Sequence, residues 1–215
     1  QKAAIISKKE IDSLLTVFQS VLDQTCGYFS EGYIAKFERD LDQKGFLQDF
    51  KQEFKKYSSD EISWEEGREE INFHLEAVIK AFAKVTNQNE GSCENIIDTY
   101  YNTYKVSIDD FAKQVKEFID LKGDDFRLNF FVDEVGQFIA ENAKLMVNLQ
   151  TIAESLNTYC KGRAWIIVTA QEALDKVVGD VSSQQANDFS KIMARFDIRM
   201  PLTSQNVAEV IQKRL

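Results

Sequence analysis

Two adjacent carboxylates at the end of an apolar run are the residues best suited to chemistry in this chain. Asp133 and Glu134 directly follow Leu128-Asn129-Phe130-Phe131-Val132, and Gly136 lies just beyond them. A run of this length, rich in aromatic and branched residues, predicts a strand buried on both faces of a parallel sheet. Because an unpaired carboxylate is disfavoured inside such a strand, we expect both acids at its C-terminal edge, where open α/β sheets bind ligands.

An apolar strand that ends in Asp-Glu has the pattern of a Walker B element. In such an element, the aspartate holds Mg²⁺ and the glutamate orients or deprotonates the attacking water. Adjacent acids are common in an acidic chain, so the dipeptide alone is a weak signal, and the apolar run in front of it strengthens the interpretation.

A second apolar run, Ala164 to Val168, ends in the hydroxyl of Thr169. Apolar residues at helical spacing lie between the two runs, and Lys161-Gly162 ends that pattern. Strand, helix and strand in this order predict a βαβ unit with a right-handed crossover. The two parallel strands would bring Asp133 and Thr169 together at one edge of the sheet, where the hydroxyl can hold the nucleophilic water or sense the terminal phosphate.

Arg195 is a further candidate. It follows a predicted helix containing Phe189, Ile192 and Met193, and it precedes Phe196–Met200, whose alternation predicts a short strand stopped by Pro201. A surface position is the plainer interpretation of this arginine. The other interpretation is an arginine finger that reaches the nucleotide of a neighbouring subunit.

Residues 1–120 carry helical periodicity throughout and predict a large helical region. Ser7 with Glu10 and Ser63 with Glu66 have the spacing of capping boxes, and the second precedes a predicted long helix that extends to Val85. The single histidine, His74, lies within that pattern, and we expect it to be structural because no other ligand spacing accompanies it. The predicted domains are therefore 1–120, helical, and 121–215, containing the strands.

Composition narrows the class of protein. The 215 residues are sufficient for a sizeable core, and 44% hydrophobic with 28% charged residues is ordinary globular composition. The net charge of −9 disfavours generic nucleic-acid binding by this chain. Three dispersed cysteines predict reduced thiols in a cytoplasmic protein. No apolar run approaches the length of a membrane span.

The motifs together resemble the second half of an AAA+-type P-loop ATPase, with Walker B, sensor 1 and an arginine-bearing helix end in order. More narrowly, Leu128–Ile139, Asn148–Glu154, Gly162–Glu172 and Ala194–Phe196 resemble the large P-loop protein of bacterial BREX phage-exclusion systems (the BrxC/PglY family). The resemblance is closest from about residue 107 to 215 and looser before it.

This resemblance implies a strongly helix-rich α/β protein, with a partial P-loop sheet of two to three parallel strands after the helical region. It implies an ATP-hydrolysing parent protein that acts in phage defence with the other BREX components and forms a homo-oligomer through Arg195. The resemblance implies that Asp133 holds Mg²⁺ and that Asp133 and Thr169 contact ATP. It also implies that Glu134 activates the water, that Thr169 is the sensor residue and that Arg195 is the arginine finger. DNA contact by the parent protein is left open, and no membrane is implied.

One departure from the family pattern limits the expected activity. The chain contains no Gly-Lys dipeptide and therefore no Walker A loop to hold the phosphates. We expect the Walker A segment upstream, an open edge beside the strand that ends at Thr169, and poor ATP binding by this chain alone. Two alternatives remain: a helical protein-interaction module without catalysis, and a metal-dependent phosphodiesterase that uses Asp133, Glu134 and Glu172.

Overall fold

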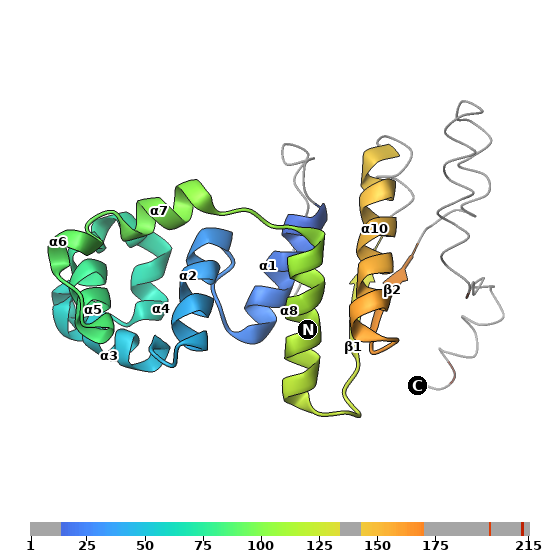
Figure 1. The fold of residues 1–215 in the computed structure, drawn as a ribbon, viewed down its shortest axis with the longest axis horizontal. Helices are drawn as coiled ribbons and strands as arrows, with labels where there is room; N and C mark the ends of the chain where they lie inside the picture. Colours follow the sequence, from blue (N-terminus) through green and yellow to red (C-terminus); the bar gives the residue numbers. More distant parts are fainter. Residues whose placement is uncertain (1–13, 134–142, 170–197, 199–211, 213–215) are drawn as a thin grey trace. The chain divides into compact units, whose positions relative to one another are not determined.

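The computed structural model describes residues 14–133 and 143–169 together with Ile198 and Gln212 (Figure 1). The chain forms two compact units. The first comprises Gln1–Phe130 and Thr151–Ile166, and the second comprises Phe131–Gln150 and Ile167–Leu215. The described residues are rich in helix and contain a small parallel sheet, which confirms the coarse fold prediction. The predicted domain division after residue 120 remains a prediction.

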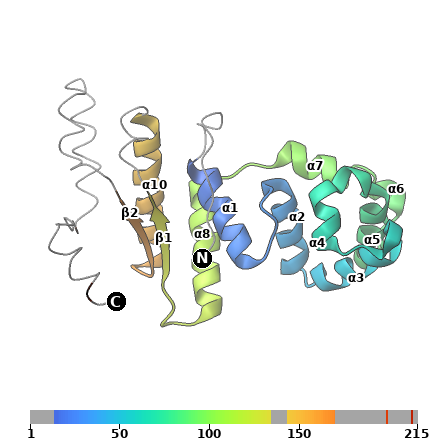
Figure 2. The same cartoon turned by 180° about the vertical axis from the view of Figure 1, so that it is seen from behind.

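The first unit begins with short helices separated by tight connections. They are α1 (Leu14–Cys26), α2 (Gly32–Gln43), α3 (Leu47–Tyr57), the 3₁₀ segment η1 (Ser59–Glu61), α4 (Trp64–Gly67), the 3₁₀ segment η2 (Arg68–Phe73), α5 (Leu75–Thr86), α6 (Glu90–Cys93), α7 (Ile96–Thr103) and α8 (Ile108–Lys122) (Figures 1 and 2).

Local sequence signals set several of these boundaries. Gly45 adopts φ +74° after α2 and donates its N–H to Asp42 O, while Phe46 N–H bonds Leu41 O, which together form a Schellman motif. Ser107 caps α8 by accepting the N–H of Asp110 at 3.1 Å. These helix ends lie where glycine and serine predict them.

The predicted long helix from Ser63 to Val85 is wrong, because α4, η2 and α5 replace it. The capping box itself is present: Ser63 Oγ accepts the Glu66 N–H, and Glu66 accepts the Ser63 N–H at 2.9 Å. The helical path then breaks at Glu70 (φ −126°, ψ 46°). This break lets Trp64 and η2 pack toward α2, while α5 runs separately along α3.

An aromatic core holds α2 through α7 together. Phe37 contacts Phe50 edge to face at 5.2 Å between ring centroids, and Trp64 contacts Phe50 at 5.0 Å and Phe54 at 5.1 Å. A Cβ at Gly67 would lie 2.5 Å from Phe54 Cζ, so only glycine permits this approach. The tight α4 turn therefore depends on a residue without a side chain.

A second aromatic cluster joins the helices to the sheet. Phe18 of α1 lies 5.1 Å from Phe130, and Phe111 of α8 lies 5.8 Å from Phe130, measured between ring centroids. Phe130 belongs to β1 (Leu128–Val132). Its ring thus anchors the first part of this strand against α1 and α8.

The helix α10 (Ala143–Cys160) connects β1 to β2 (Ala164–Val168). It lies beside α8 (Figures 1 and 2), where Tyr159 donates to Asp109 Oδ2 at 3.0 Å and Cys160 donates to Ala112 O at 3.9 Å. Lys161 at φ +50° and Gly162 at φ +80° then turn the chain into β2. The predicted βαβ order and the Lys161-Gly162 helix end are confirmed.

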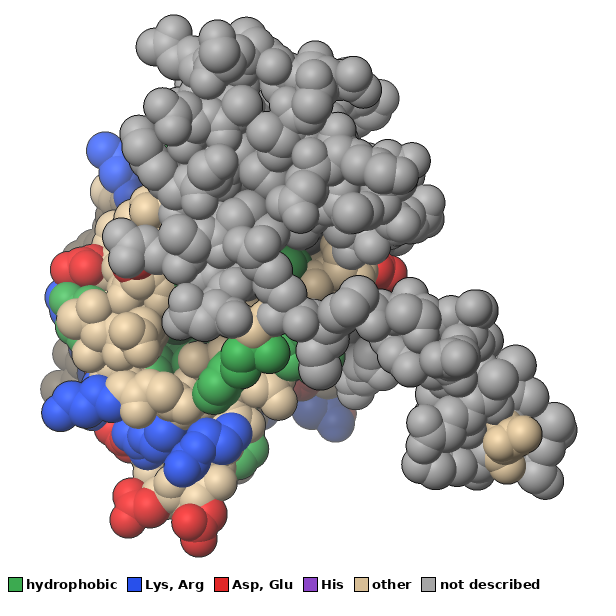
Figure 3. Space-filling view, turned by 90° about the vertical axis from the view of Figure 1, so that its right-hand side faces the viewer, with side chains coloured by type: hydrophobic (Ala, Val, Ile, Leu, Met, Phe, Trp, Pro, Cys, Tyr) green, Lys and Arg blue, Asp and Glu red, His purple; other side chains and the backbone are tan. Residues whose placement is uncertain are grey.

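The prediction that the Walker B-like strand is buried on both faces is wrong. Phe130 is 7% exposed, whereas its neighbour Phe131 is 70% exposed. Successive residues of a strand point to opposite faces, and in the described part of the chain helices cover only the face that carries Phe130. Hydrophobic side chains reach the surface on the side of the molecule shown in Figure 3.

Several predicted elements fall outside the described residues. They are the Ser7–Glu10 capping box, the helix around Phe189 and Ile192, and most of the strand Phe196–Met200. Within that strand only Ile198 is described, and it lies in neither a helix nor a strand. In the described residues, no helix combines the length and apolarity that a membrane crossing needs.

Candidate functional site

The register of the two strands decides which side chains meet at the sheet edge. Leu128 N–H donates to Arg163 O, and Thr169 N–H donates to Val132 O, both at 3.0 Å. The pairing advances in the same direction along both strands, so they are parallel. This register places Asp133 opposite Thr169.

Asp133 and Thr169 are in direct contact. Thr169 Oγ1 donates a hydrogen bond to Asp133 Oδ1, and both residues are exposed to solvent. Both belong to the second compact unit. The predicted meeting of these two side chains at the ends of adjacent parallel strands is confirmed.

This pair offers an oxygen-rich surface suited to a hard cation and to a water molecule. A carboxylate and a hydroxyl are ligand types that Mg²⁺ accepts, and Mg²⁺ sites commonly use one or two carboxylates completed by water and phosphate. A hydroxyl that donates a hydrogen bond to a carboxylate belongs to a group type that can also accept one from water. The donor set therefore fits a cation and an oriented water at this edge.

The remaining predicted site residues are not in the described part of the chain. Glu134, Arg195 and Glu172 lie outside the described residues, so their positions relative to Asp133 and Thr169 remain predictions. Among the described residues, no group of three or more His, Cys, Asp or Glu side chains is arranged to hold a metal ion. The roles assigned to Asp133, Glu134, Thr169 and Arg195 therefore stay predictions.

The open edge expected beside β2 stays a prediction, because most of the chain after Thr169 lies outside the described residues. The described sheet has two strands in the order β1-β2, so β2 hydrogen-bonds to one neighbour within the described residues. Ile167 on this strand is 39% exposed.

His74 has the surroundings of a structural residue. Its ring packs edge to face against Phe54, with 6.2 Å between centroids, and it is half-buried between η2 and α5. In the described residues no acidic, cysteine or second histidine cluster surrounds it to form a metal site.

Sequence reasoning missed a buried carboxylate in the helical unit. Glu38 is 1% exposed and accepts hydrogen bonds at 2.6 Å from Phe29 N, Trp64 Nε1 and Arg68 Nη1. The signal was present, because Glu38 lies four residues after Ile34 on the apolar stripe of α2. A charge on such a stripe indicates a buried ion pair.

A second buried carboxylate, Asp23 of α1, also belongs to this unit. It pairs with Arg39 and accepts from Gln19 Nε2 at 3.0 Å. Burial raises the pKa of Asp23, and the Arg39 guanidinium opposes that shift. The arrangement is a structural ion pair that links α1 to α2.

Comparison with known proteins adds no assignment, because no protein-family model matches this chain and no solved structure matches it. The conclusions about its chemistry therefore depend on the geometry of the Asp133–Thr169 edge and on the sequence motifs around it.

Proposed function

We propose that residues 121–215 form the Walker B and sensor half of an AAA+-type P-loop ATPase. The observation that supports this proposal is the Asp133–Thr169 hydrogen bond at the ends of adjacent parallel strands. Phosphoryl transfer requires a cation ligand and a water-orienting group at one sheet edge.

In this proposal, each residue has a stated task. Asp133 holds Mg²⁺, and Thr169 positions the attacking water or contacts the terminal phosphate. Glu134 orients or deprotonates that water, and Arg195 reaches the nucleotide of a neighbouring subunit. When bound, Mg²⁺ neutralises charge that develops on the transferred phosphoryl group.

The resemblance to the BrxC/PglY family extends the proposal to the parent protein, a cytoplasmic ATPase of a phage-defence system. Because this chain has no Gly-Lys dipeptide, its phosphate-binding loop comes from another segment of the parent protein. The chain by itself is then inert toward ATP. Isothermal titration of the 215-residue chain with Mg-ATP should detect no micromolar affinity.

Catalysis is tested in a longer polypeptide that carries the preceding P-loop. Glu134→Gln should lower kcat by about 10²-fold or more, as expected on losing a general base, with ATP affinity retained. Asp133→Asn should weaken Mg²⁺ binding and raise the Mg²⁺ concentration needed for turnover. Asp124→Asn, which changes an exposed acid before β1, is the matched control. Unchanged turnover in Glu134→Gln would reject the Walker B assignment, and no turnover in the unsubstituted longer polypeptide would favour the protein-interaction module.

A further inference from the structure

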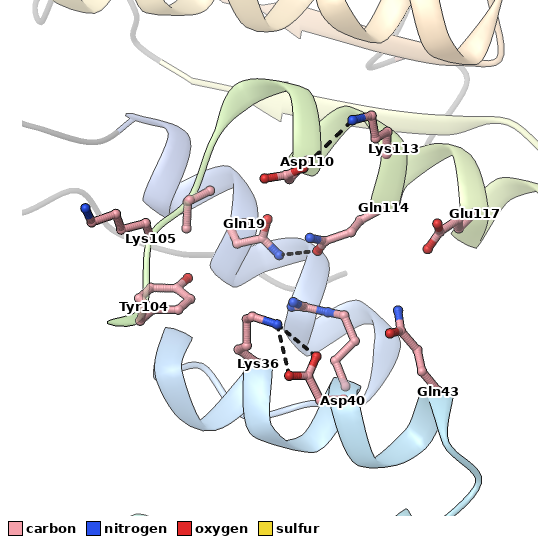
Figure 4. Close-up of a pocket in the computed structure, with 12 residues that line it drawn as sticks. Gln19, Lys36, Asp40, Gln43, Tyr104, Lys105, Asp110, Lys113, Gln114 and Glu117 are labelled. Atoms are coloured by element: carbon pink, nitrogen blue, oxygen red, sulfur yellow. Dashed lines mark hydrogen bonds and ion pairs between the residues drawn. The ribbon is translucent and has the colours of Figure 1, made fainter. Parts of the chain in front are cut away.

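A polar pocket of about 370 Å³ opens in the first compact unit. Its walls come from α2 and α8, its floor includes Gln19 of α1, and residues 104–106 close one end (Figure 4). The volume lies at the lower end of the range of small-molecule sites. Asp133 and Thr169 do not line this pocket, so a ligand bound here would be distinct from the nucleotide.

The side-chain amide of Gln19 has its orientation fixed by a buried charge. Asp23, which pairs with Arg39, accepts a hydrogen bond from Gln19 Nε2 at 3.0 Å, and Gln114 Oε1 accepts a second from the same nitrogen at 2.9 Å. Turning the amide over would place its oxygen against a carboxylate oxygen and an amide oxygen, neither of which can donate. Gln19 Nε2 is therefore committed to these two acceptors, and Gln19 Oε1 must face away from them.

One acceptor and one donor of this amide pair stay available to a ligand. Gln19 is 2% exposed, and within the described residues its Oε1 is buried without a hydrogen-bond partner. Among the same residues, Gln114 Nε2 donates no hydrogen bond. Figure 4 shows the Gln19 oxygen and the Gln114 nitrogen on the same side of the hydrogen bond that joins the two amides. Because that bond is 2.9 Å long, one small head group can reach both atoms.

The charges around the amide pair favour a neutral ligand. Four basic and three acidic side chains line the pocket, and Asp23, which pairs with Arg39, supplies a fourth negative charge. Within the wall itself, Lys36 pairs with Asp40 at 2.8 Å. An ion that entered this balanced surface would lose hydration without gaining a partner of opposite charge.

An aromatic ring borders the amide pair. Tyr104 and Val106 line the same pocket. Burial and, less strongly, the nearby Asp23 carboxylate raise the pKa of Tyr104 to about 12, which places this side chain close to the Gln19–Asp23 contact. An apolar group attached to the head of a ligand would contact these two side chains.

We propose that this pocket binds a small neutral molecule through a primary carboxamide. The carboxamide N–H donates to Gln19 Oε1, and the carboxamide oxygen accepts from Gln114 Nε2, so both atoms of the head group are matched. A carboxylate has no proton for Gln19 Oε1, and an amidinium has no acceptor for Gln114 Nε2. Pairing the buried Gln19 oxygen removes the cost of leaving it without a donor.

Four ring compounds that differ only in the head group test this requirement on the 215-residue chain. They are benzamide, benzoate, benzamidine and acetophenone, followed by proton–nitrogen NMR. Benzamide should give saturable shifts of the side-chain NH₂ signals of Gln19 and Gln114. The other three should bind about tenfold more weakly, because each leaves one hydrogen-bonding group of the pair unmatched. Equal affinity of all four compounds would overturn the proposal, as would no saturation by benzamide, the result expected if only a water molecule bridges the two amides.

The substitution Gln114→Glu locates the ligand by reversing its preference. The new carboxylate keeps an oxygen for Gln19 Nε2 and replaces the N–H donor with a second acceptor. Benzamide affinity should therefore fall about tenfold, and benzamidine should become the preferred ligand. Since the hydrogen bond to Gln19 is kept, circular dichroism should show an unchanged fold.

The matched control is Gln43→Glu, which introduces the same charge at another, exposed glutamine of the pocket. This variant should still prefer benzamide, because the Gln19–Gln114 pair is unchanged. Benzamide preference that persists in Gln114→Glu, or the same reversal in Gln43→Glu, would refute the assignment.

Discussion

The substitution Glu38→Gln, which removes a charge and changes the shape of the side chain little, should strongly destabilise the helical unit. Glu38 Oε1 accepts from Trp64 Nε1 and Arg68 Nη1, and Oε2 accepts from Phe29 N, all at 2.6 Å. In Glu38→Gln the single amide oxygen can accept hydrogen bonds either from the two donors at the Oε1 position or from the one donor at the Oε2 position, but not from both. The amide NH₂ then faces a donor, and the Arg68 side chain, 14% exposed, loses its anion.

The expected decrease in the free energy of unfolding follows from these contacts. Breaking one partner of a buried ion pair costs about 3–5 kcal/mol. Retained hydrogen bonds to the amide place Glu38→Gln near the lower limit, about 3 kcal/mol. For a chain of this length, the Tm should fall by roughly 6–12 °C.

Urea unfolding followed by far-UV circular dichroism measures this free energy. The control is Glu76→Gln, which removes an exposed carboxylate paired with Lys80 and should leave stability unchanged. The double variant Glu38→Gln/Arg68→Met should recover part of the loss, because it also removes the uncompensated guanidinium. An ordinary surface substitution changes the free energy of unfolding by about 0.5 kcal/mol or less. If Glu38→Gln lies within that range of the unsubstituted chain, the buried charge does not stabilise the fold as argued.

Three further predictions test the packing and its chemistry. Phe130→Ala should cost about 3–5 kcal/mol in urea unfolding, whereas Phe131→Ala should cost under about 1 kcal/mol, and similar losses would contradict the strand register. Burial raises the pKa of the Cys26 thiol to about 11. At pH 8 its alkylation should therefore run about a hundredfold slower than that of a free cysteine, and it should accelerate as the pH rises toward 11. A fast reaction at pH 8 would contradict that shift. Ser63→Ala removes the N-cap of α4 and should cost about 1 kcal/mol, and an unchanged unfolding midpoint would show that the capping box contributes nothing.

Local signals predicted the features that depend on a few neighbouring residues. Gly45 and Ser107 end and begin helices as their chemistry requires, and the order of apolar runs around Lys161-Gly162 predicted the βαβ unit. The Asp133–Thr169 contact was predictable because parallel strands align their C-terminal ends at one edge.

Features that depend on contacts between residues far apart in the chain could not be predicted from the sequence. The break at Glu70 accompanies the hydrogen bonds from Trp64 and Arg68 to Glu38, which join positions 26 and 30 residues apart. The exposure of Phe131 could not be predicted from an apolar run, because periodicity does not reveal how many faces of a sheet are covered.

The two tryptophans of this chain give it a pair of built-in optical reporters. Trp64 is 1% exposed among phenylalanines, so its emission should be blue-shifted, whereas Trp165 on β2 is 48% exposed and should emit nearer to the wavelength of tryptophan in water. Replacing either one with phenylalanine leaves a single tryptophan, which can be excited selectively at the red edge of tyrosine absorption. Quenching by iodide would then follow the helical core and the strand separately, without any attached dye.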